Sequence, residues 1–256
     1  LANLLGQPFY QQREILRVLF SAGEENDWLA RTAQEGWSKY VKEASDWGAY
    51  QTIARPGFSE GLLFGAQLNV KSLIKKYQTH LLEKQQLRQA KFHYDQLTIT
   101  KQGVQYQDIQ AANVVFCEGY QGAQNPWFNH LPFEVVKGEV LLIRLNQKQA
   151  HRILKQKIIL APQGEELYSV DANYEHSPQD ALPSEKGHRY LLERLQLALD
   201  VPYEEVNHLA AIRPATFDRR PFLGRHPEHP SLAIFNGLGA KGSSLGPYFA
   251  HQLTHH

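Results

Sequence analysis

A strand–glycine–helix unit near the end of the chain constrains the fold more than any other feature. The apolar run Leu232–Phe235 is typical of a buried strand, and the sequence NGLGAKGSSLGPYFAHQL follows it. In that segment Gly237, Gly239 and Gly242 have the spacing G-x-G-x-x-G and precede a helical pattern. Glycines at such a junction permit a tight turn and a close approach of the backbone to a ligand, and the first N–H groups of the helix attract anions.

The same spacing opens the strand–helix–strand unit of dinucleotide-binding folds. In that unit a second strand follows the helix, and an acidic residue about 20 positions after the glycines binds the ribose. Only fourteen residues follow Gly242, and none of them is Asp or Glu. The dinucleotide interpretation is therefore excluded. Two interpretations remain: a tight turn without a ligand, or a cradle for a negatively charged group at residues 239–243.

The composition is that of an ordinary globular protein. The chain has 256 residues, of which 42% are hydrophobic and 21% charged, and its formal net charge is +1, so neither disorder nor a nucleic-acid-binding charge excess is indicated. No apolar run approaches the roughly 20 residues that span a bilayer, and no secretory start is visible. The single cysteine, Cys117, excludes an intrachain disulfide and is expected to be a small buried residue. We therefore expect a cytoplasmic protein without a membrane or nucleic-acid partner.

Helical and strand patterns alternate irregularly along the chain, which predicts a mixed α/β fold whose two layers interleave in sequence. Residues 21–44 are predicted to form a helix capped by Asn26 or Asp27, and residues 184–199 a helix capped by Ser184. Strands are expected on both sides of a turn at Gly103, over Asn113–Cys117 as a buried strand, and over residues 133–145. Apolar helical stripes are formed by Leu73, Ile74, Tyr77, Leu81 and Leu82 in a third helix, and by Leu191, Leu192 and Leu195 in the helix after Ser184.

The segment Ala211–Leu253 carries further motifs in a definite order. They are Arg213-Pro214, Asp218, Pro221, Gly224, the glycine loop and Pro247. In this order and spacing they resemble the C-terminal segment of the FAD-dependent D-amino-acid oxidase/glycine oxidase superfamily. The stretches ANVVFCEGYQG, VVKGEVLLIRL and LYSVDANYEHSPQDALPSEKG resemble upstream segments of that superfamily, so the resemblance extends from about Leu62 to the end.

The resemblance implies two interleaved domains: a Rossmann-like FAD-binding layer, incomplete at the N-terminus, and a β-sheet substrate domain with flanking helices. It assigns residues 1–60 and 123–212 to the substrate domain, and residues 61–122 and 213–256 to the FAD-binding domain. The superfamily carries its own G-x-G-x-x-G and ribose-binding acidic residue at its N-terminus, and residues 1–60 contain no such motif. Because the chain starts at Leu1 and has no methionine, we expect that unit upstream of Leu1, and weak FAD binding without it.

The function implied by the resemblance is that of an FAD-dependent oxidoreductase. Such an enzyme oxidises the C–N bond of a small amine or amino acid by hydride transfer to flavin N5, and dioxygen or another electron acceptor reoxidises the flavin. Arg213 matches the arginine that binds the substrate carboxylate in the glycine-oxidase branch. Lys241 matches a carboxylate-binding lysine of a sarcosine-oxidase-like branch, with a solvated lysine as the alternative. Tyr174 is expected to supply a phenol to the site, with a core or rim tyrosine as the alternative.

The resemblance also implies where the backbone would meet the cofactor. Gly119 and Gly122 would bring the end of the strand Asn113–Cys117 close to FAD, and N–H groups of the glycine loop would stabilise negative charge at flavin N1/O2. The loop residues are Gly237, Leu238, Gly239, Ala240, Lys241 and Gly242. No metal site is expected, because the prolines that flank His226 and His229 prevent the helix that would align them.

Some positions depart from the superfamily pattern. Asp171 stands where many relatives have glycine, and Ile159 stands where amino-acid oxidases often have a substrate-facing tyrosine, so simple glycine or D-alanine specificity is in doubt. Asp218 is expected to cap a turn rather than to act as an acid or base. One alternative is a flavin-dependent tRNA-modification enzyme of the same fold, which 27 basic against 26 acidic residues do not favour. The other is a truncated, non-catalytic binding module. Substrate, electron acceptor and oligomeric state stay open.

Overall fold

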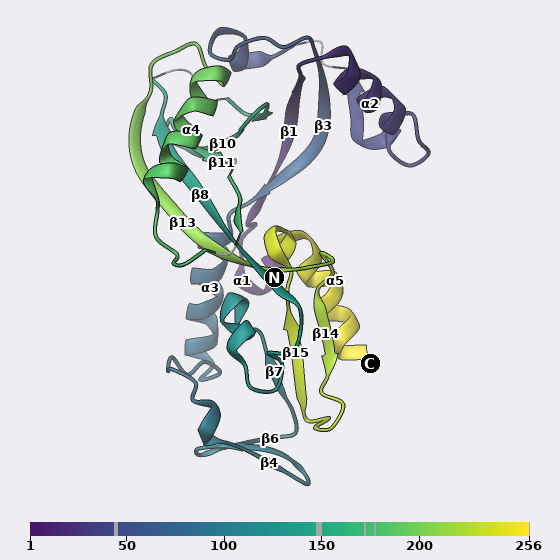
Figure 1. Cartoon of the computed structure of the whole chain (residues 1–256), viewed down its shortest axis with the longest axis vertical. Coiled ribbons are helices and arrows are strands. Elements are labelled where there is room, and N and C mark those ends of the chain that lie inside the picture. The colour runs from purple at the N-terminus through teal and green to yellow at the C-terminus, as the bar shows by residue number, and fades with distance from the viewer. Residues whose placement is uncertain (44–45, 147–149, 172, 177, 256) are drawn as a thin grey trace. The chain divides into compact units, whose positions relative to one another are not determined.

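The computed structural model describes residues 1–43, 46–146, 150–171, 173–176 and 178–255. The chain has a mixed α/β fold, as predicted (Figure 1). It divides into two compact units, each built from separate stretches of sequence. Unit 1 comprises Leu1–Leu73, Gly138–Tyr174 and Leu182–Ala211, and unit 2 comprises Ile74–Lys137, Glu175–Ala181 and Ile212–His256.

The largest sheet among the described residues has nine strands, most of them in unit 1. Their order is β12-β8-β11-β10-β9-β1-β3-β2, and β13 pairs with β8. β1 is antiparallel to β3 and parallel to β9. The strands are β1 (Tyr10–Leu19), β2 (Val41–Glu43), β3 (Ser59–Leu68), β8 (Phe133–Arg144), β9 (Ile153–Lys155), β10 (Ile159–Gly164), β11 (Leu167–Asp171), β12 (Glu175–His176) and β13 (Glu204–Thr216).

One face of this sheet in unit 1 forms the main hydrophobic core with α4 (Glu185–Ala198) (Figure 1). Because side chains alternate along a strand, Leu16 and Val18 of β1 lie on the core side, and both are buried. Leu191 and Leu195 of α4 pack into the same core, which confirms the predicted stripe. The predicted cap is also confirmed, since the Ser184 Oγ accepts a hydrogen bond from the backbone N–H of Gly187 at 3.0 Å.

The first predicted helix is shorter than expected and begins earlier. α2 spans Ala22–Thr32, so the predictions of a cap at Asn26 or Asp27 and of a helix to residue 44 are wrong. The cap is Ser21, whose Oγ accepts from Glu24 N at 3.2 Å, while Glu24 Oε2 accepts from Phe20 N at 3.0 Å. The pair resembles a capping box, except that Glu24 accepts from the residue before the cap, and it fixes the start of the helix at the earlier polar residue. After α2 the chain makes a single turn of 3₁₀ helix at Ser38–Tyr40 and enters β2.

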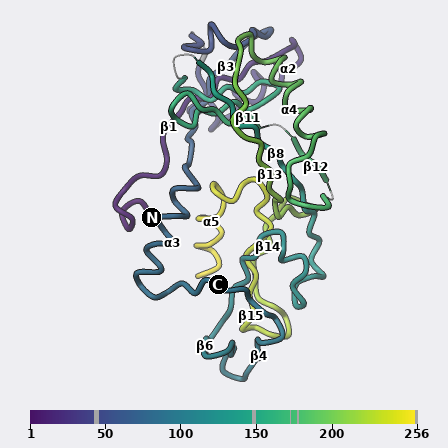
Figure 2. Tube along the Cα trace, turned by 90° about the vertical axis from the view of Figure 1, so that its left-hand side faces the viewer, coloured from purple at the N-terminus to yellow at the C-terminus, as the bar shows by residue number. Residues whose placement is uncertain are grey.

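Unit 2 contains two three-stranded sheets among its described residues. In the first, β15 (Leu232–Asn236) lies between β14 (Phe222–Arg225) and β7 (Val114–Phe116), antiparallel to β14 and parallel to β7. Figure 2 shows β14 and β15 beside α5 (Gly242–His255). The second sheet is a meander of β4 (Leu97–Thr100), β5 (Gly103–Tyr106) and β6 (Ile109–Ala111), with the predicted turn at Gly103.

The expected buried strand Asn113–Cys117 is only partly correct. β7 covers Val114–Phe116, and of these residues only Phe116 is buried. Cys117 is exposed, so the prediction of a buried cysteine is wrong. The reason is that, among the residues that the structure describes, β7 is an edge strand paired with β15 alone, so less of its surface is covered.

The other described helices are short or extend from a strand. α1 spans Ala2–Leu5, and α3 spans Val70–Glu83, where the sequence predicts a helix. The apolar stripe of α3 is largely uncovered, since Ile74 and Leu82 are each 51% exposed. Among the residues that the structure describes, no helix combines the length and the hydropathy needed to cross a bilayer.

Candidate functional site

The glycine loop after β15 lies beside the segment that follows β7. The two strands are parallel, with Ile234 opposite Phe116, so their carboxyl ends meet at the same edge of the sheet. The side chain of Asn236 joins the two ends, because its Nδ2 donates to the carbonyl oxygen of Gly119 at 2.8 Å. The residues singled out at 119–122 and at 237–242, far apart in sequence, therefore form one structural group in unit 2.

Two of these glycines are required by packing. Gly237 has φ +77° and is buried, and a Cβ there would lie 2.5 Å from Thr216 Cγ2. A Cβ on Gly122 would lie 2.5 Å from Asn236 Nδ2. Any side chain at either position would push the loop and its neighbours apart. The tight-turn interpretation accounts for these two glycines.

Two other glycines of the group have open space beside them. Gly119 has φ +62° and a Cβ there would meet no atom within 4 Å, while a Cβ on Gly239, φ +53°, would meet only Ala215, at 3.8 Å. In the described part of the chain, no backbone carbonyl accepts from the N–H groups of Gly239 and Ala240, just before α5. Free N–H groups at the start of a helix attract a polar or negatively charged group. The cradle interpretation therefore fits this part of the loop.

Arg213 lies on β13, three residues before the contact with the loop. The end of that strand is held in place, because Thr216 Oγ1 donates to the carbonyl oxygen of Arg220 at 2.8 Å. Asp218 Oδ1 accepts from Arg220 N at 3.0 Å, which confirms that this carboxylate caps a turn. Since Thr216 packs against Gly237, the strand that carries the half-buried Arg213 is fixed against the glycine loop.

The remaining predicted side chains are exposed. Lys241 ends the 3₁₀ turn Gly239–Lys241, and its backbone N–H donates to Leu238 O at 2.9 Å. Tyr174 is 65% exposed and belongs to unit 1, whereas Arg213, Lys241 and the glycine loop belong to unit 2. The structure thus groups the arginine strand with the loop inside unit 2, and this group does not include Tyr174.

Sequence reasoning missed the polar residues that support the group. Asn236 is 4% exposed and its Oδ1 also accepts from Gly237 N at 2.8 Å, so one amide orients both chain segments. Glu118 accepts from the Tyr94 hydroxyl at 2.6 Å and from Asn125 Nδ2 at 2.8 Å. Burial, together with the Glu118 carboxylate, raises the pKa of Tyr94 above its ordinary value. The only sequence signals were a polar residue next to each glycine, in NGLG and in CEGYQG.

Comparison with known proteins identifies the class of protein to which this fold and its glycine-lined sheet edge belong. The sequence matches the FAD dependent oxidoreductase family, DAO, over residues 4–256. The chain belongs to this family, whose cofactor is FAD, and the predicted resemblance is confirmed.

Solved structures show the same fold. Glycine oxidase from Geobacillus kaustophilus has a TM-score of 0.80 at 18% identity, over 99% of this chain and 74% of that chain. Iminodiacetate oxidase from Chelativorans has a TM-score of 0.74 at 19% identity, over 98% and 74%. L-α-glycerophosphate oxidase from Mycoplasma pneumoniae, solved with FAD bound, has a TM-score of 0.76 at 11% identity, over 96% and 72%. At these identities the likeness concerns the fold.

Proposed function

We propose that this FAD-dependent oxidoreductase oxidises the C–N bond of a small amine or amino acid that carries a carboxylate. The observation that supports this proposal is the position of Arg213, on the strand fixed against the glycine loop by the contact of Thr216 with Gly237. When bound, FAD would accept hydride from the carbon next to nitrogen, and dioxygen or another acceptor would reoxidise it. Solved relatives of this fold include oxidases of glycine and of iminodiacetate.

In this proposal the glycine loop holds the polar edge of the flavin ring. The N–H groups of Gly239 and Ala240 have no described carbonyl acceptor, and a Cβ on Gly119 would meet no atom within 4 Å. Donors that are already fixed by the fold stabilise developing negative charge without reorganisation during the reaction. Gly122, Gly237, Leu238 and Gly242 would shape the cradle around these donors.

Arg213 would bind the carboxylate of the substrate. A guanidinium forms two parallel hydrogen bonds with a carboxylate, which fixes both the position and the orientation of the bound molecule. Because the side chain is half-buried, the ion pair is less screened than on an open surface. We propose Lys241 as a second cation for the same anion and Tyr174 as a phenol donor to the substrate. Unit 1 then serves as the substrate domain and unit 2 as the FAD-binding domain.

A substrate panel tests the reaction class. The protein, expressed from its complete reading frame and loaded with FAD, is mixed anaerobically with glycine, sarcosine, both enantiomers of alanine, and glycerol 3-phosphate. Loss of the visible absorbance of oxidised flavin reports reduction. We expect reduction by at least one carboxylate-bearing amine. Reduction by glycerol 3-phosphate and by none of the amines would contradict the proposal.

Variants of two arginines test the role of Arg213. Arg213→Ala should retain bound flavin and lose kcat/KM by an amount corresponding to about 2–5 kcal/mol, mainly through KM, because a buried carboxylate loses its charged partner. Arg213→Lys should recover part of the loss, since one charge is kept without the bidentate geometry. Arg220→Ala is the control, because that side chain is 86% exposed. Equal kinetics of Arg213→Ala and the wild type would refute the assignment.

A further inference from the structure

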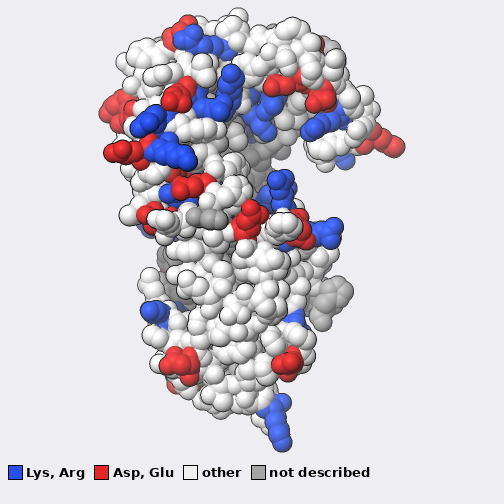
Figure 3. Space-filling view, viewed as in Figure 1, with Lys and Arg blue, Asp and Glu red and all other residues white. Residues whose placement is uncertain are grey.

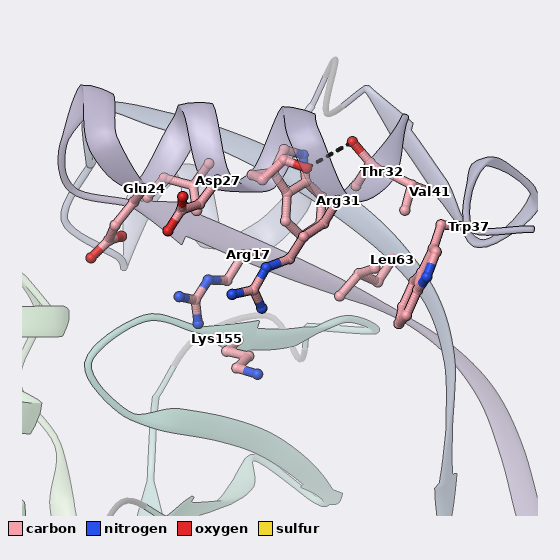
Figure 4. Close-up of a pocket in the computed structure, with 11 residues that line it drawn as sticks. Arg17, Glu24, Asp27, Arg31, Thr32, Trp37, Val41, Leu63 and Lys155 are labelled. Atoms are coloured by element: carbon pink, nitrogen blue, oxygen red, sulfur yellow. Dashed lines mark hydrogen bonds between the residues drawn. The ribbon is translucent and has the colours of Figure 1, made fainter. Parts of the chain in front are cut away.

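Unit 1 contains a pocket beneath α2 whose lining residues are given no role in the reaction proposed above. The cavity has a volume of about 400 Å³, and its walls come from β1, β3, β9, α2 and the segment that follows α2. Three of its lining residues are cationic: Arg17, Arg31 and Lys155 (Figure 4). We call this cavity the α2 pocket.

Strand alternation and register place two of the cations together. On β1, Arg17 stands between Leu16 and Val18, which are 0% and 1% exposed and face the core, so Arg17 faces the other side of the sheet. β1 and β9 are parallel, and Arg17 is the register partner of Lys155. Register partners share a face and are about 4.8 Å apart, so two positive side chains are direct neighbours there.

The third cation, Arg31, is carried by α2, which covers this face of the sheet. Gly61 on β3 is the other register partner of Arg17, and a Cβ there would lie 2.4 Å from Cζ2 of Trp28. The Trp28 ring therefore rests on the backbone of β3 at a point where only glycine fits. Arg31 follows three positions later, on the same side of the helix. Figure 4 shows the guanidinium groups of Arg17 and Arg31 beneath α2 and the side chain of Lys155 below them, on the same side of the pocket.

The protein does not neutralise these cations itself. In the part of the chain that the structure describes, no carboxylate oxygen lies within 4.0 Å of a side-chain nitrogen of Arg17, Arg31 or Lys155. Two carboxylates, Glu24 and Asp27, also line the pocket, and Glu24 is engaged in the cap of α2. One positive charge is left in excess. Burial, and then the charge of Arg17, lowers the pKa of Lys155.

Apart from Thr32, the rest of the wall is apolar. Trp28, Trp37, Val41 and Leu63 line the pocket, and Trp37 is 52% exposed although its ring borders the cavity. We propose that the α2 pocket binds an organic oxyanion, a carboxylate or a phosphate attached to a flat apolar body. The guanidinium groups of Arg17 and Arg31 and the ammonium of Lys155 bind the anionic group, and the indole rings contact the body. This inference does not depend on the proposed reaction.

Calorimetric titration of the FAD-loaded Arg213→Ala variant, which lacks the carboxylate-binding arginine proposed above, tests the ligand class without any turnover. The probes are phenylacetate, phenyl phosphate, neutral benzyl alcohol and inorganic phosphate. We expect one of the two aromatic anions to bind at least about tenfold more tightly than benzyl alcohol and inorganic phosphate. The tighter of the two anions identifies the head group. Equal affinity of benzyl alcohol, or no binding of either anion at about 10 mM, would overturn the proposal.

Variants locate the binding to the pocket. Lys155→Met and Arg17→Met should each lower the affinity for the preferred anion by about 10- to 100-fold, the usual effect of losing one charge-assisted hydrogen bond. Lys157→Met is the matched control, because this lysine lies two residues away and its Nζ stacks 5.2 Å from the centroid of the Phe20 ring. An equal loss in Lys155→Met and Lys157→Met would show a general effect of net charge and refute the site. Unchanged flavin reduction kinetics in these variants keeps this result separate from the test of Arg213.

Discussion

The two faces of the large sheet in unit 1 differ in whether their charged side chains are engaged by described residues. On the face covered by α4, the carboxylate of Glu139 is 1% exposed and fully engaged. Its Oε2 accepts from Ser184 N at 3.0 Å and lies 2.8 Å from Nε2 of His208, while its Oε1 accepts from Ser184 Oγ at 2.7 Å. On the face covered by α2, Arg17, Arg31 and Lys155 line one pocket, and no described carboxylate oxygen lies within 4.0 Å of their side-chain nitrogens.

This difference indicates that the Glu139 carboxylate stabilises the fold, whereas the three cations belong to the proposed anion-binding site. Glu139 ties β8 to the start of α4, and a Cβ on Gly187 would lie 2.3 Å from the carboxylate carbon, so the helix fits only without a side chain there. On the surface shown in Figure 3, basic and acidic side chains are interspersed. Arg17, Arg31 and Lys155 line one pocket with one positive charge in excess. Their mutual repulsion lowers the stability of the free protein, and binding an anion offsets that loss.

The largest effect is expected from breaking the engaged carboxylate. Glu139→Ala leaves the Ser184 hydroxyl and N–H without their buried acceptor and removes the carboxylate that lies 2.8 Å from His208 Nε2, so the free energy of unfolding should fall by about 3–5 kcal/mol. Urea denaturation measures it. Glu134→Ala is the control, because that carboxylate is 43% exposed and pairs with the exposed His176, and it should change stability by less than about 1 kcal/mol. Similar losses in both variants would remove the contrast between the faces.

A smaller effect is expected where α2 rests on the sheet. Gly61→Ala places a Cβ 2.4 Å from the Trp28 ring, so the helix must shift, and stability should fall by about 1–3 kcal/mol with a change in tryptophan fluorescence. Gly23→Ala, on α2 itself, meets only Ser21 Oγ at 3.7 Å and should be neutral or stabilising by up to about 1 kcal/mol. A tolerated Gly61→Ala would show that the α2 pocket is not shaped by this contact.

An acid-dependent effect is expected at Glu14, which lies on the core side of β1. Lys42 and Arg152 both pair with it and hold its pKa below the ordinary value. Its contribution to stability is therefore present above the unfolded-state pKa and is lost as the pH falls through the lower folded-state pKa. Glu14→Gln should cost about 1 kcal/mol at neutral pH, and this cost should shrink as the pH falls through the lowered folded-state pKa of Glu14. The exposed Glu60→Gln should show no such convergence when unfolding curves are compared across pH.

The smallest expected effect is an increase in stability, and it tests the comparison between the two faces of the sheet most directly. Lys155→Met removes one of two like charges in register, so it should raise stability by about 0.5 kcal/mol at neutral pH while it weakens anion binding. Because the folded state holds Lys155 with a lowered pKa, the unfolded state binds more protons at alkaline pH, and wild-type stability rises there relative to the variant. The difference should shrink with rising pH. A variant that is less stable than the wild type would show that Lys155 is structural.

Local signals in the sequence were sufficient where short-range chemistry decides the structure. The Ser184 cap, the turn at Gly103 and the strand–glycine–helix unit each depend on residues within a few positions of one another. The order of motifs after Arg213 was enough to identify the FAD-dependent oxidoreductase family. The errors have different causes. The cap at Ser21 competed with later polar residues, which is a local effect, whereas Cys117 is exposed beside β7, whose position at a sheet edge is set by tertiary pairing.

The sequence by itself therefore determined the family, the mixed α/β class and the position of the glycine loop, because these depend on residue types and short spacings. Only the tertiary structure decided that Asn236 joins Gly119 and that Arg17 and Lys155 are neighbours. Both contacts arise from parallel strand pairing between segments far apart in the chain. The register of such pairs is set by the burial of whole strand faces, which no local pattern around either residue encodes.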